Sequence, residues 1–394
     1  VLGNAFGSIK RLEIGLETTE FSEIGQRIAD MTKMEIPSGV FNKIRKLPEL
    51  SKMSESFPKL EKSGPVTEVI NESPSFDKIP ILKSWPKDAG KFITFGLVAT
   101  KHPETCIRNL GVYRIQIIDS THALMHWQKH KRGAAHYDIS KEKGSKIDVA
   151  VIIGGDPATI FSAIAPVPEG LDKYLFAGIT RKKGIKTVKC KTIDLEVPAN
   201  AEIVLEGNVD STDIRNEGPF GDHTGFYTPQ EPFPTFTLTG IMQRKNPIYL
   251  TTVVGKPILE DAYIGKVIER SFLPLIRMLH PEVVDFSMPP AGWFQGLAIV
   301  SIKKRYPGQA KKVMMGLWGM GQLSLTKMFI VVDHDVNVHD MNDVIWAITT
   351  RVDAARDITI IDKTPTDTLD PASPLVNLGS KLGIDATQKT LEEG

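Results

Sequence analysis

Between residues 92 and 254, short stretches rich in apolar residues follow one another, with polar residues, Gly and Pro between them. Stretches of this length and composition predict β-strands, and few long helical patterns separate them. The predicted strands are 92–99, 112–118, 147–154, 187–195, 201–209, 235–242 and 248–254. So many short strands in succession predict a barrel-like sheet.

Near the start of the chain the spacing of apolar residues is helical instead. Phe21, Ile24, Ile28 and Met31 recur every three or four residues, which predicts a short amphipathic helix. Residues 37–86 form a stretch rich in Lys, Ser, Glu and Pro, and we expect a surface connection with brief ordered pieces there.

Three further helices are predicted within and after the strand-rich region. Asp156 followed by Pro157 is typical of a helix start, because Asp caps free backbone N–H groups and Pro suits the first turn. This start predicts a helix over 158–165, and a second helix is predicted over 171–181. A long helix over 260–279 is expected to connect two domains.

The last part of the chain alternates between the two kinds of pattern. Strands are predicted at 297–302, 328–332 and 358–361, and helices at 309–318 and 341–351. This alternation predicts a smaller α/β domain. From residue 379 on we expect a loop or a short helix.

Composition and charge restrict the classes of function. Apolar residues make up 41% of the 394 and charged residues 24%, which is typical of folded globular proteins. Forty-eight Lys and Arg residues balance 47 Asp and Glu residues. Because the net charge is +1, no overall field favours nucleic acid or an anionic membrane.

Cysteine usage and hydropathy indicate the compartment. Cys106 and Cys190 lie far apart and outside any Cys-x-x-Cys spacing, which argues against a disulfide scaffold or a thiolate metal site. No apolar run approaches the roughly 20 residues needed to span a bilayer. We therefore expect a cytoplasmic protein without a membrane span.

Two carboxylates flank a tight bend in the segment Glu217-Gly-Pro-Phe-Gly-Asp222. The Gly and Pro residues turn the chain back on itself, so the side chains of Glu217 and Asp222 can converge. Two nearby carboxylates separate their pKa values, so that one stays ionised and the other can carry a proton. The alternative is a surface turn with two solvated acids.

A second candidate segment is Asn109-Leu-Gly-Val-Tyr-Arg114, at the start of a predicted strand. The planar guanidinium of Arg114 matches a carboxylate or a phosphate, so it can bind an acidic substrate or its acidic neighbours. The alternative is an exposed Arg on an edge strand.

Four histidines, His122, His126, His130 and His136, surround Trp127 in the sequence. Such a cluster can supply a metal ligand, phosphate contacts and an aromatic wall. Its spacing matches no standard zinc pattern, so purely structural histidines are the alternative. The chain also lacks the Gly-x-Ser-x-Gly and His-Glu-x-x-His signatures of common hydrolases.

Read in order, six blocks of the sequence resemble the UbiD family of prenylated-flavin decarboxylases, whose best-known members act on 3-polyprenyl-4-hydroxybenzoate. The blocks are 109–114, 155–159, 195–207, 217–225, 343–351 and 380–387. The resemblance implies an α+β fold in which a long helix joins a flavin-binding split β-barrel to a C-terminal α/β domain.

The resemblance also implies a division of the chain. Residues 1–90 would pack on the core, 91–259 would form the barrel that binds prenylated flavin mononucleotide (FMN), 260–280 would connect, and 281–394 would be an α/β oligomerisation domain. A homo-oligomer, from dimer to hexamer, is expected.

In this family an Arg and two acidic residues lie over the cofactor, and Arg114, Glu217 and Asp222 match them. Asp222 is then the expected proton donor, with Glu217 and Arg114 setting its protonation and the geometry of the site. Loss of CO2 from an sp2 carbon leaves an electron pair that no ordinary side chain accepts, so a cofactor is needed.

The same resemblance implies residues for the cofactor and for a metal ion. Those expected to hold the flavin and its phosphate are Val112, Tyr113, Arg114, His126, Trp127, Gln128, Lys131, Arg132 and Lys327. The family's divalent ion, usually Mn2+, would take Asn109 and His130 as ligands, and K+ is a second candidate ion for this chain.

One position departs from the family pattern. Where the family has Glu before Tyr-x-Phe-Ala-Gly, this chain has Lys173 before Tyr174. A charged Lys cannot ligate Mn2+, so we expect weak or absent Mn2+ binding. Either Asp172 substitutes as the ligand, or the ammonium of Lys173 itself neutralises the cofactor phosphate.

The function implied is non-oxidative decarboxylation of an aromatic or α,β-unsaturated acid, foremost 3-polyprenyl-4-hydroxybenzoate in ubiquinone biosynthesis. Other phenolic, acrylic or isoprenoid-precursor acids stay open. A flavin prenyltransferase would supply the cofactor, and a polyprenylated substrate would bring peripheral membrane contact. Two rival hypotheses are a flavin-dependent oxidoreductase on a split-barrel fold, against which the missing dinucleotide fingerprint weighs, and a non-catalytic flavin carrier.

Overall fold

The structure is a computed structural model that describes residues 1–32, 54–167 and 170–393. It divides into two compact units. The first, called the barrel unit, comprises Val1–Glu17 and Glu35–Glu260, and the second, called the C-terminal unit, comprises Thr18–Met34 and Asp261–Gly394. Part of the predicted surface connection lies outside the described residues. None of the described helices is long and apolar enough to cross a membrane.

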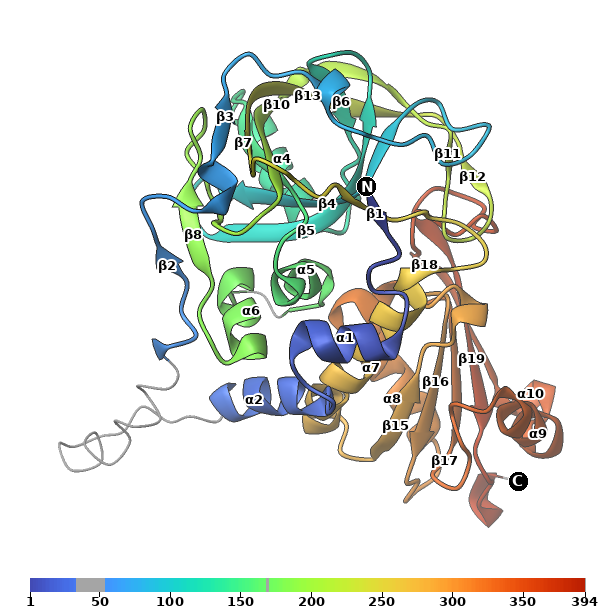
Figure 1. The fold of residues 1–394 in the computed structure, drawn as a ribbon. Coiled ribbons are helices and arrows are strands. Elements are labelled where there is room, and N and C mark those ends of the chain that lie inside the picture. The colour runs from blue at the N-terminus through green and yellow to red at the C-terminus, as the bar shows by residue number, and fades with distance from the viewer. Residues whose placement is uncertain (33–53, 168–169, 394) are drawn as a thin grey trace, which may run out of the picture. The chain divides into compact units, whose positions relative to one another are not determined.

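Six strands of the barrel unit pair in a closed ring. Their order is β10-β7-β4-β5-β6-β13, and β13 pairs back onto β10 (Figure 1). The strands are β4 (Phe92–Lys101), β5 (Arg108–Ile117), β6 (His122–Met125), β7 (Ile147–Ile153), β10 (Ile203–Glu217) and β13 (Glu231–Gln243), with β3 (Val69–Asn71) added to β13. Because β13 pairs with β10, the sheet closes on itself, and the predicted barrel-like sheet is confirmed. Closure also leaves few free strand edges.

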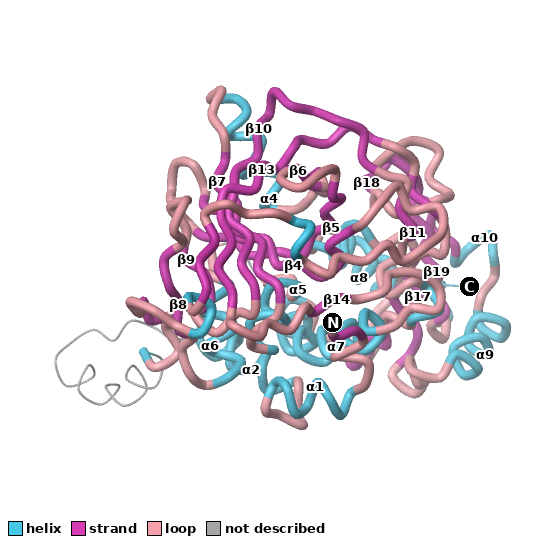
Figure 2. The backbone as a smooth tube through the Cα atoms, turned by 45° about the horizontal axis from the view of Figure 1, so that its top comes forward, coloured by secondary structure: helices cyan, strands magenta, loops and turns pink. Residues whose placement is uncertain are grey.

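The neighbouring strands β4, β5 and β7 run side by side in Figure 2 and are buried on both faces over much of their length. Helix α4 (Arg132–Glu142) packs against all three, and α5 (Pro157–Ile164) packs against β5 and α6 (Lys173–Arg181). This cover explains why β4 and β7 are almost continuously apolar rather than alternating.

The remaining elements of the barrel unit are short. They are α1 (Ile9–Leu16), the 3-10 helices η1 (Pro65–Thr67) and η2 (Phe76–Lys78), and strands β1 (Leu2–Gly3), β2 (Lys59–Leu60), β8 (Lys186–Lys189), β9 (Glu196–Pro198), β11 (Phe220–Gly221), β12 (Tyr227–Thr228) and β14 (Leu250–Thr251). Strands β11 and β12 form a small antiparallel hairpin directly after β10.

The C-terminal unit contains a five-stranded sheet of order β15-β16-β17-β19-β18. Its strands are β15 (Val283–Ser287), β16 (Leu297–Ile302), β17 (Met328–Asp333), β18 (Ile358–Pro365) and β19 (Leu378–Ala386). The three central strands are parallel, and each edge strand is antiparallel to its neighbour. This is the predicted α/β arrangement.

Helices cover both faces of this sheet. Leu273 of α7 and Val313 of α8 join Val300 of β16 in one apolar core, and Val344 of α9 joins Ile330 of β17 in the other. The elements are α2 (Ser22–Thr32), α7 (Glu260–Leu279), α8 (Gln309–Trp318), α9 (Met341–Arg351) and α10 (Ala354–Asp357), with 3-10 helices η3 (Pro290–Gly292), η4 (Gly321–Leu325) and η5 (Leu391–Glu393).

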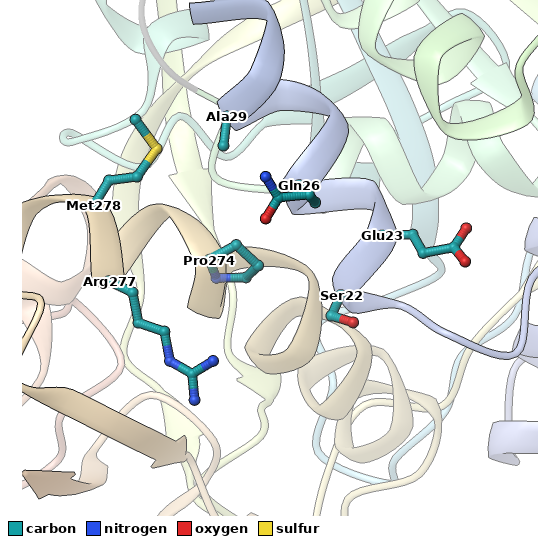
Figure 3. Close-up of a pocket in the computed structure, with 7 residues that line it drawn as sticks. All are labelled: Ser22, Glu23, Gln26, Ala29, Pro274, Arg277 and Met278. Carbon is teal, nitrogen blue, oxygen red and sulfur yellow. The ribbon is translucent and has the colours of Figure 1, made fainter. Parts of the chain in front are cut away.

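Helices α2 and α7 approach closely within the C-terminal unit. A Cβ atom on Gly25 would lie 1.8 Å from the carbonyl oxygen of Ser271, so the crossing requires glycine. A surface pocket beside this crossing is lined by Ser22, Glu23, Gln26, Ala29, Pro274, Arg277 and Met278 (Figure 3). None of the residues predicted to bind cofactor, metal or substrate lines it.

Most predicted elements are confirmed, with ends shifted by a few residues, but the strand predicted over 187–195 is wrong. Strand β8 ends at Lys189, and β9 begins only at Glu196. The buried carboxylate of Glu206 accepts the backbone N–H groups of Lys191 and Thr192 and holds the chain in a loop between them.

The prediction of a loop or short helix for the tail is wrong for residues 379–386, which belong to strand β19, and it is confirmed after them, where a loop leads to the 3-10 helix η5. The side chains of β19 alternate in burial, but polar and small residues occupy many of the positions.

Helix α4 was not predicted for a related reason. Its buried face consists mainly of small and polar side chains, including Gly133, Ala134 and His136, which give no apolar period.

Candidate active site

Arg114 meets two carboxylates that follow it by 103 and 108 residues in the chain. Arg114 on β5 binds both oxygens of Glu217, through Nε at 2.8 Å and Nη2 at 2.9 Å. Its Nη1 donates to Oδ2 of Asp222 at 2.7 Å. Arg114 thus holds the two carboxylates predicted to converge, and the alternatives of an exposed Arg and of solvated acids are wrong.

Burial makes these contacts strong. The side chains of Arg114, Glu217 and Asp222 are 9%, 0% and 6% exposed, so water screens them little. Burial by itself would raise the pKa of Glu217, but hydrogen bonds from His126 and Arg114 and the charge of Arg114 lower that pKa to about 2. Burial by itself would lower the pKa of Arg114, but the hydrogen bonds and charges of Glu217 and Asp222 raise it. Glu217 and Arg114 therefore both stay charged at neutral pH.

The bend after β10 places Asp222. Gly218 has φ +93°, a conformation that a residue with a side chain rarely adopts, and its N–H donates to the buried side chain of Gln116 at 2.8 Å. The chain then enters the β11–β12 hairpin, where the backbone N–H of Asp222 donates to the carbonyl of Phe226 at 3.1 Å. The hairpin returns the Asp222 carboxylate toward β5.

Three neighbours of this set were not predicted as its partners. Nδ1 of His126 lies 3.2 Å from Oε2 of Glu217, Thr228 accepts from Nη2 of Arg114 at 3.2 Å, and the ring of Phe220 lies 4.9 Å from the guanidinium. Burial lowers the pKa of His126, so a neutral ring donates to Glu217. The antiparallel pairing of β5 with β6 could have indicated His126, because it places this residue beside Arg114.

An aromatic group includes Tyr113 and Trp127, which adjoin Arg114 and His126 in the sequence. Trp127 packs edge-on against Tyr113, with ring centroids 5.0 Å apart, and lies nearly parallel to Tyr137. The Tyr113 hydroxyl accepts the backbone N–H of Gly133 at 3.1 Å, and Nε1 of Trp127 is buried without a hydrogen-bond partner among the described residues. Aromatic rings beside an unsatisfied donor suit a flat heteroaromatic ligand such as a flavin.

Basic residues predicted for the cofactor phosphate follow directly in the chain. Nζ of Lys131 donates to the carbonyl of Val112 at 3.1 Å and lies over the Tyr113 ring, and Nη2 of Arg132 donates to the carbonyl of Val167 at 2.9 Å. Because both side chains are cationic and are held in place by backbone carbonyls, they fit the phosphate of an FMN-type cofactor. Gln128 is half-buried beside them.

Lys327 belongs to the C-terminal unit, where its Nζ pairs with Asp370 at 2.9 Å. Its predicted contact with the cofactor phosphate stays a prediction.

The residues expected to bind Mn2+ do not fit that ion. Asn109 is buried and hydrogen-bonded to Tyr113, whereas His130 is exposed. Among the described residues no three His, Cys, Asp or Glu side chains are grouped to hold a metal. Asp172 cannot substitute, because it caps α6 and accepts two N–H groups from Arg108 at 2.8 and 3.0 Å.

The other two histidines of the sequence cluster have separate structural roles. His122 lies 2.9 Å from Asp119, and Nδ1 of His136 lies 2.9 Å from the hydroxyl of buried Thr100. Only His126 of the four reaches the charged set.

Comparisons with known families cover most of the chain. The 3-octaprenyl-4-hydroxybenzoate carboxy-lyase Rift-related domain of the UbiD family matches residues 59–257, and the C-terminal domain of the same carboxy-lyase matches residues 262–386. An uncharacterised protein of Archaeoglobus fulgidus is 54% identical over 395 residues, covering 100% of this chain and 82% of the relative.

Solved structures with a similar fold include a UbiD-class enzyme and a vanillic acid decarboxylase. HmfF of Pelotomaculum thermopropionicum, in complex with FMN, is 26% identical with a TM-score of 0.81, covering 98% of this chain and 82% of that one. Vanillic acid decarboxylase of Sedimentibacter hydroxybenzoicus, in its closed form, is 26% identical with a TM-score of 0.86. The match covers 100% of this chain and 82% of that one. An evolved dimeric form of HmfF is in complex with prenylated FMN, at 25% identity and a TM-score of 0.79, covering 98% and 82%.

Proposed function

The chain belongs to the UbiD family and is a flavin-using decarboxylase of aromatic or unsaturated acids, and we propose that its flavin is prenylated FMN. We further propose 3-polyprenyl-4-hydroxybenzoate as the first substrate to test. The description of the family supports that acid, and the similarity to vanillic acid decarboxylase supports smaller phenolic acids as the next. A flavin prenyltransferase would supply the cofactor.

The observation that carries the proposal is the buried set of Arg114, Glu217 and Asp222. Arginine has five N–H donors, and four hydrogen bonds to protein are made here. The remaining N–H on Nη1 has no partner among the described residues, and it can receive the substrate carboxylate. Glu217, held ionised, keeps the guanidinium in this orientation.

Replacing CO2 by hydrogen consumes one proton, which we assign to the Asp222 carboxyl. Its Oδ2 lies 2.7 Å from Nη1 of Arg114, so a carboxylate bound there has its reacting carbon close to the acid. Asp222 donates the proton to the carbon that has lost CO2 and regains one from solvent. The bound flavin supplies the acceptor for the electron pair left by CO2. Trp127, Tyr113, Lys131 and Arg132 would hold it.

An Asp222→Asn substitution tests this assignment in protein produced together with a flavin prenyltransferase. Asn cannot donate a carboxyl proton, so CO2 release from an active acid should fall by about 1,000-fold or more, while flavin content stays unchanged. The matched control is Asp138→Asn on the exposed side of α4, which should release CO2 at the wild-type rate. Near-normal turnover by Asp222→Asn would refute the proton-donor role.

A further inference from the structure

Lys173 is a buried cation at the position where the UbiD pattern has a metal-binding Glu. It is the first residue of α6 and is 9% exposed. Its Nζ donates to the carbonyl oxygens of Ala163 at 3.1 Å and Ala165 at 2.9 Å, at the C-terminal end of α5. Carbonyls at a helix C-terminus carry partial negative charge, so the ammonium is held by backbone alone.

The electrostatic surroundings of Lys173 are positive. Burial, then the charges of Arg132 and Lys131, lower the pKa of Lys173 to about 7. A phosphate dianion bound beside Lys173 favours the charged form and raises this pKa again. No described carboxylate pairs with Lys173, because the adjacent Asp172 is bound by Arg108 and by the first backbone N–H groups of α6. Three neighbouring cations repel one another, and an anion placed among them offsets that repulsion.

One donor of Lys173 remains for such an anion. An ammonium has three N–H groups, and the two bonds to carbonyls leave a third without a partner among the described residues. Arg132 donates from Nη2 to the carbonyl of Val167, and its other guanidinium N–H groups have no partner among the residues that the structure describes. Cations held in place by backbone carbonyls are preorganised for a phosphate.

We propose that Lys173 takes the place of the divalent cation and binds the flavin phosphate directly, so that this protein holds its cofactor without a metal ion. This inference rests on the proposed flavin site. The reason is that Lys173 puts an ammonium where the family pattern has a carboxylate. Positive charge at this position repels Mn2+ and attracts the phosphate dianion, which Mn2+ would otherwise bind.

Binding of FMN to purified protein tests the proposal without any variant. The dissociation constant, from quenching of flavin fluorescence, is compared in buffer with a chelator and in buffer with saturating Mn2+. We expect agreement within about twofold and no stoichiometric metal by mass spectrometry. A constant at least about tenfold lower with Mn2+ would overturn the inference and leave the flavin site standing. No FMN binding in either buffer would overturn the proposed function and the inference together.

Variants of Lys173 make the test specific to this side chain. Lys173→Met should weaken FMN binding by about 10- to 100-fold in both buffers, because one charge-assisted hydrogen bond is lost. Riboflavin, which lacks the phosphate, should bind this variant and the wild type equally. Lys173→Glu should weaken FMN binding under chelation and recover with Mn2+, whereas the exposed control Lys183→Glu should behave as wild type in both buffers.

Other outcomes for the variants would contradict the proposal. Wild-type FMN affinity in Lys173→Met, or an equal loss for FMN and riboflavin, would show that Lys173 does not contact the phosphate. Thermal melting identifies any variant that fails to fold. If a variant does not fold, the comparison of FMN binding by the wild type with chelator and with Mn2+ tests the proposal by itself.

Discussion

Glu217 is fully buried and yet ionised, which shows how single residues set up the site. Desolvation opposes its charge, and the fork of Arg114 reverses the balance by binding both carboxylate oxygens at once. Lysine in place of Arg114 would keep the charge but lose this geometry. The buried His126 adds a further hydrogen bond to Glu217.

The depressed pKa of Glu217 predicts how stability depends on pH. The pKa falls from 4.5 to about 2 on folding, so Glu217 contributes stability above about pH 4.5 and loses that contribution as the pH falls toward 2. Glu217→Gln should lower the free energy of unfolding by about 3 kcal/mol near neutral pH, and this difference should shrink below about pH 4.5. Urea denaturation over a pH series measures it.

All other titrating groups are shared by the wild type and the Glu217→Gln variant. Their contributions therefore cancel in the difference between the two free energies of unfolding. The exposed Glu142→Gln serves as the control, with a small effect at every pH. A difference for Glu217→Gln that stays constant down to about pH 3 would contradict the assigned ionisation.

At the scale of elements, the bend between β10 and β11 decides where the proton donor lies. The antiparallel pairing of β10 with β13 runs to Glu217, and the chain turns at Gly218 into the β11–β12 hairpin. A Cβ atom on Gly218 would lie 2.9 Å from the carbonyl oxygen of Pro229. The backbone there is therefore both conformationally restricted and closely packed.

Gly218→Ala should for that reason impair catalysis more than folding. The strained φ costs about 1–2 kcal/mol of stability, and the shift of Asp222 that relieves the contact should reduce CO2 release by about 100-fold. Gly144→Ala is the matched control, since Gly144 has φ +63° and no atom within 4 Å of its would-be Cβ. Its stability should fall similarly, with normal CO2 release. Equal activity of the two variants would contradict this role of the bend.

At the scale of the whole molecule, charge and exposed apolar surface bear on assembly. Positive and negative residues almost cancel, so like-charge repulsion between copies is weak. In the C-terminal unit Ile345, Trp346 and Ile360 are 51%, 51% and 71% exposed, so they are accessible to a second copy of the chain.

We therefore expect the purified chain to associate with itself. Light scattering coupled to size-exclusion chromatography should give a mass at least twice the 43.5 kDa of one chain at micromolar concentration. A mass equal to that of a single chain across this range would refute the expected oligomer.

The elements with clear periodicity were predictable because their signal is local. Helices α7, α8 and α9 and strand β16 match their predicted ranges closely, since apolar spacing over ten to twenty residues reports which face is buried. Strand β19 and helix α4 gave no such signal. Their buried positions hold small or polar residues, and only neighbouring elements show them to be buried.

The sequence by itself determined the fold class, the identity of Arg114, Glu217 and Asp222 as candidates, and the exchange at Lys173, because residue types and ordered motifs carry that information. Tertiary structure decided which groups meet. Arg114 and Glu217 are 103 residues apart, and only closure of the barrel brings them within 2.8 Å. It also decided that His126 supports Glu217 and that Asp172 is committed to Arg108, because hydrogen bonds between distant segments follow from strand pairing and burial rather than from spacing along the chain.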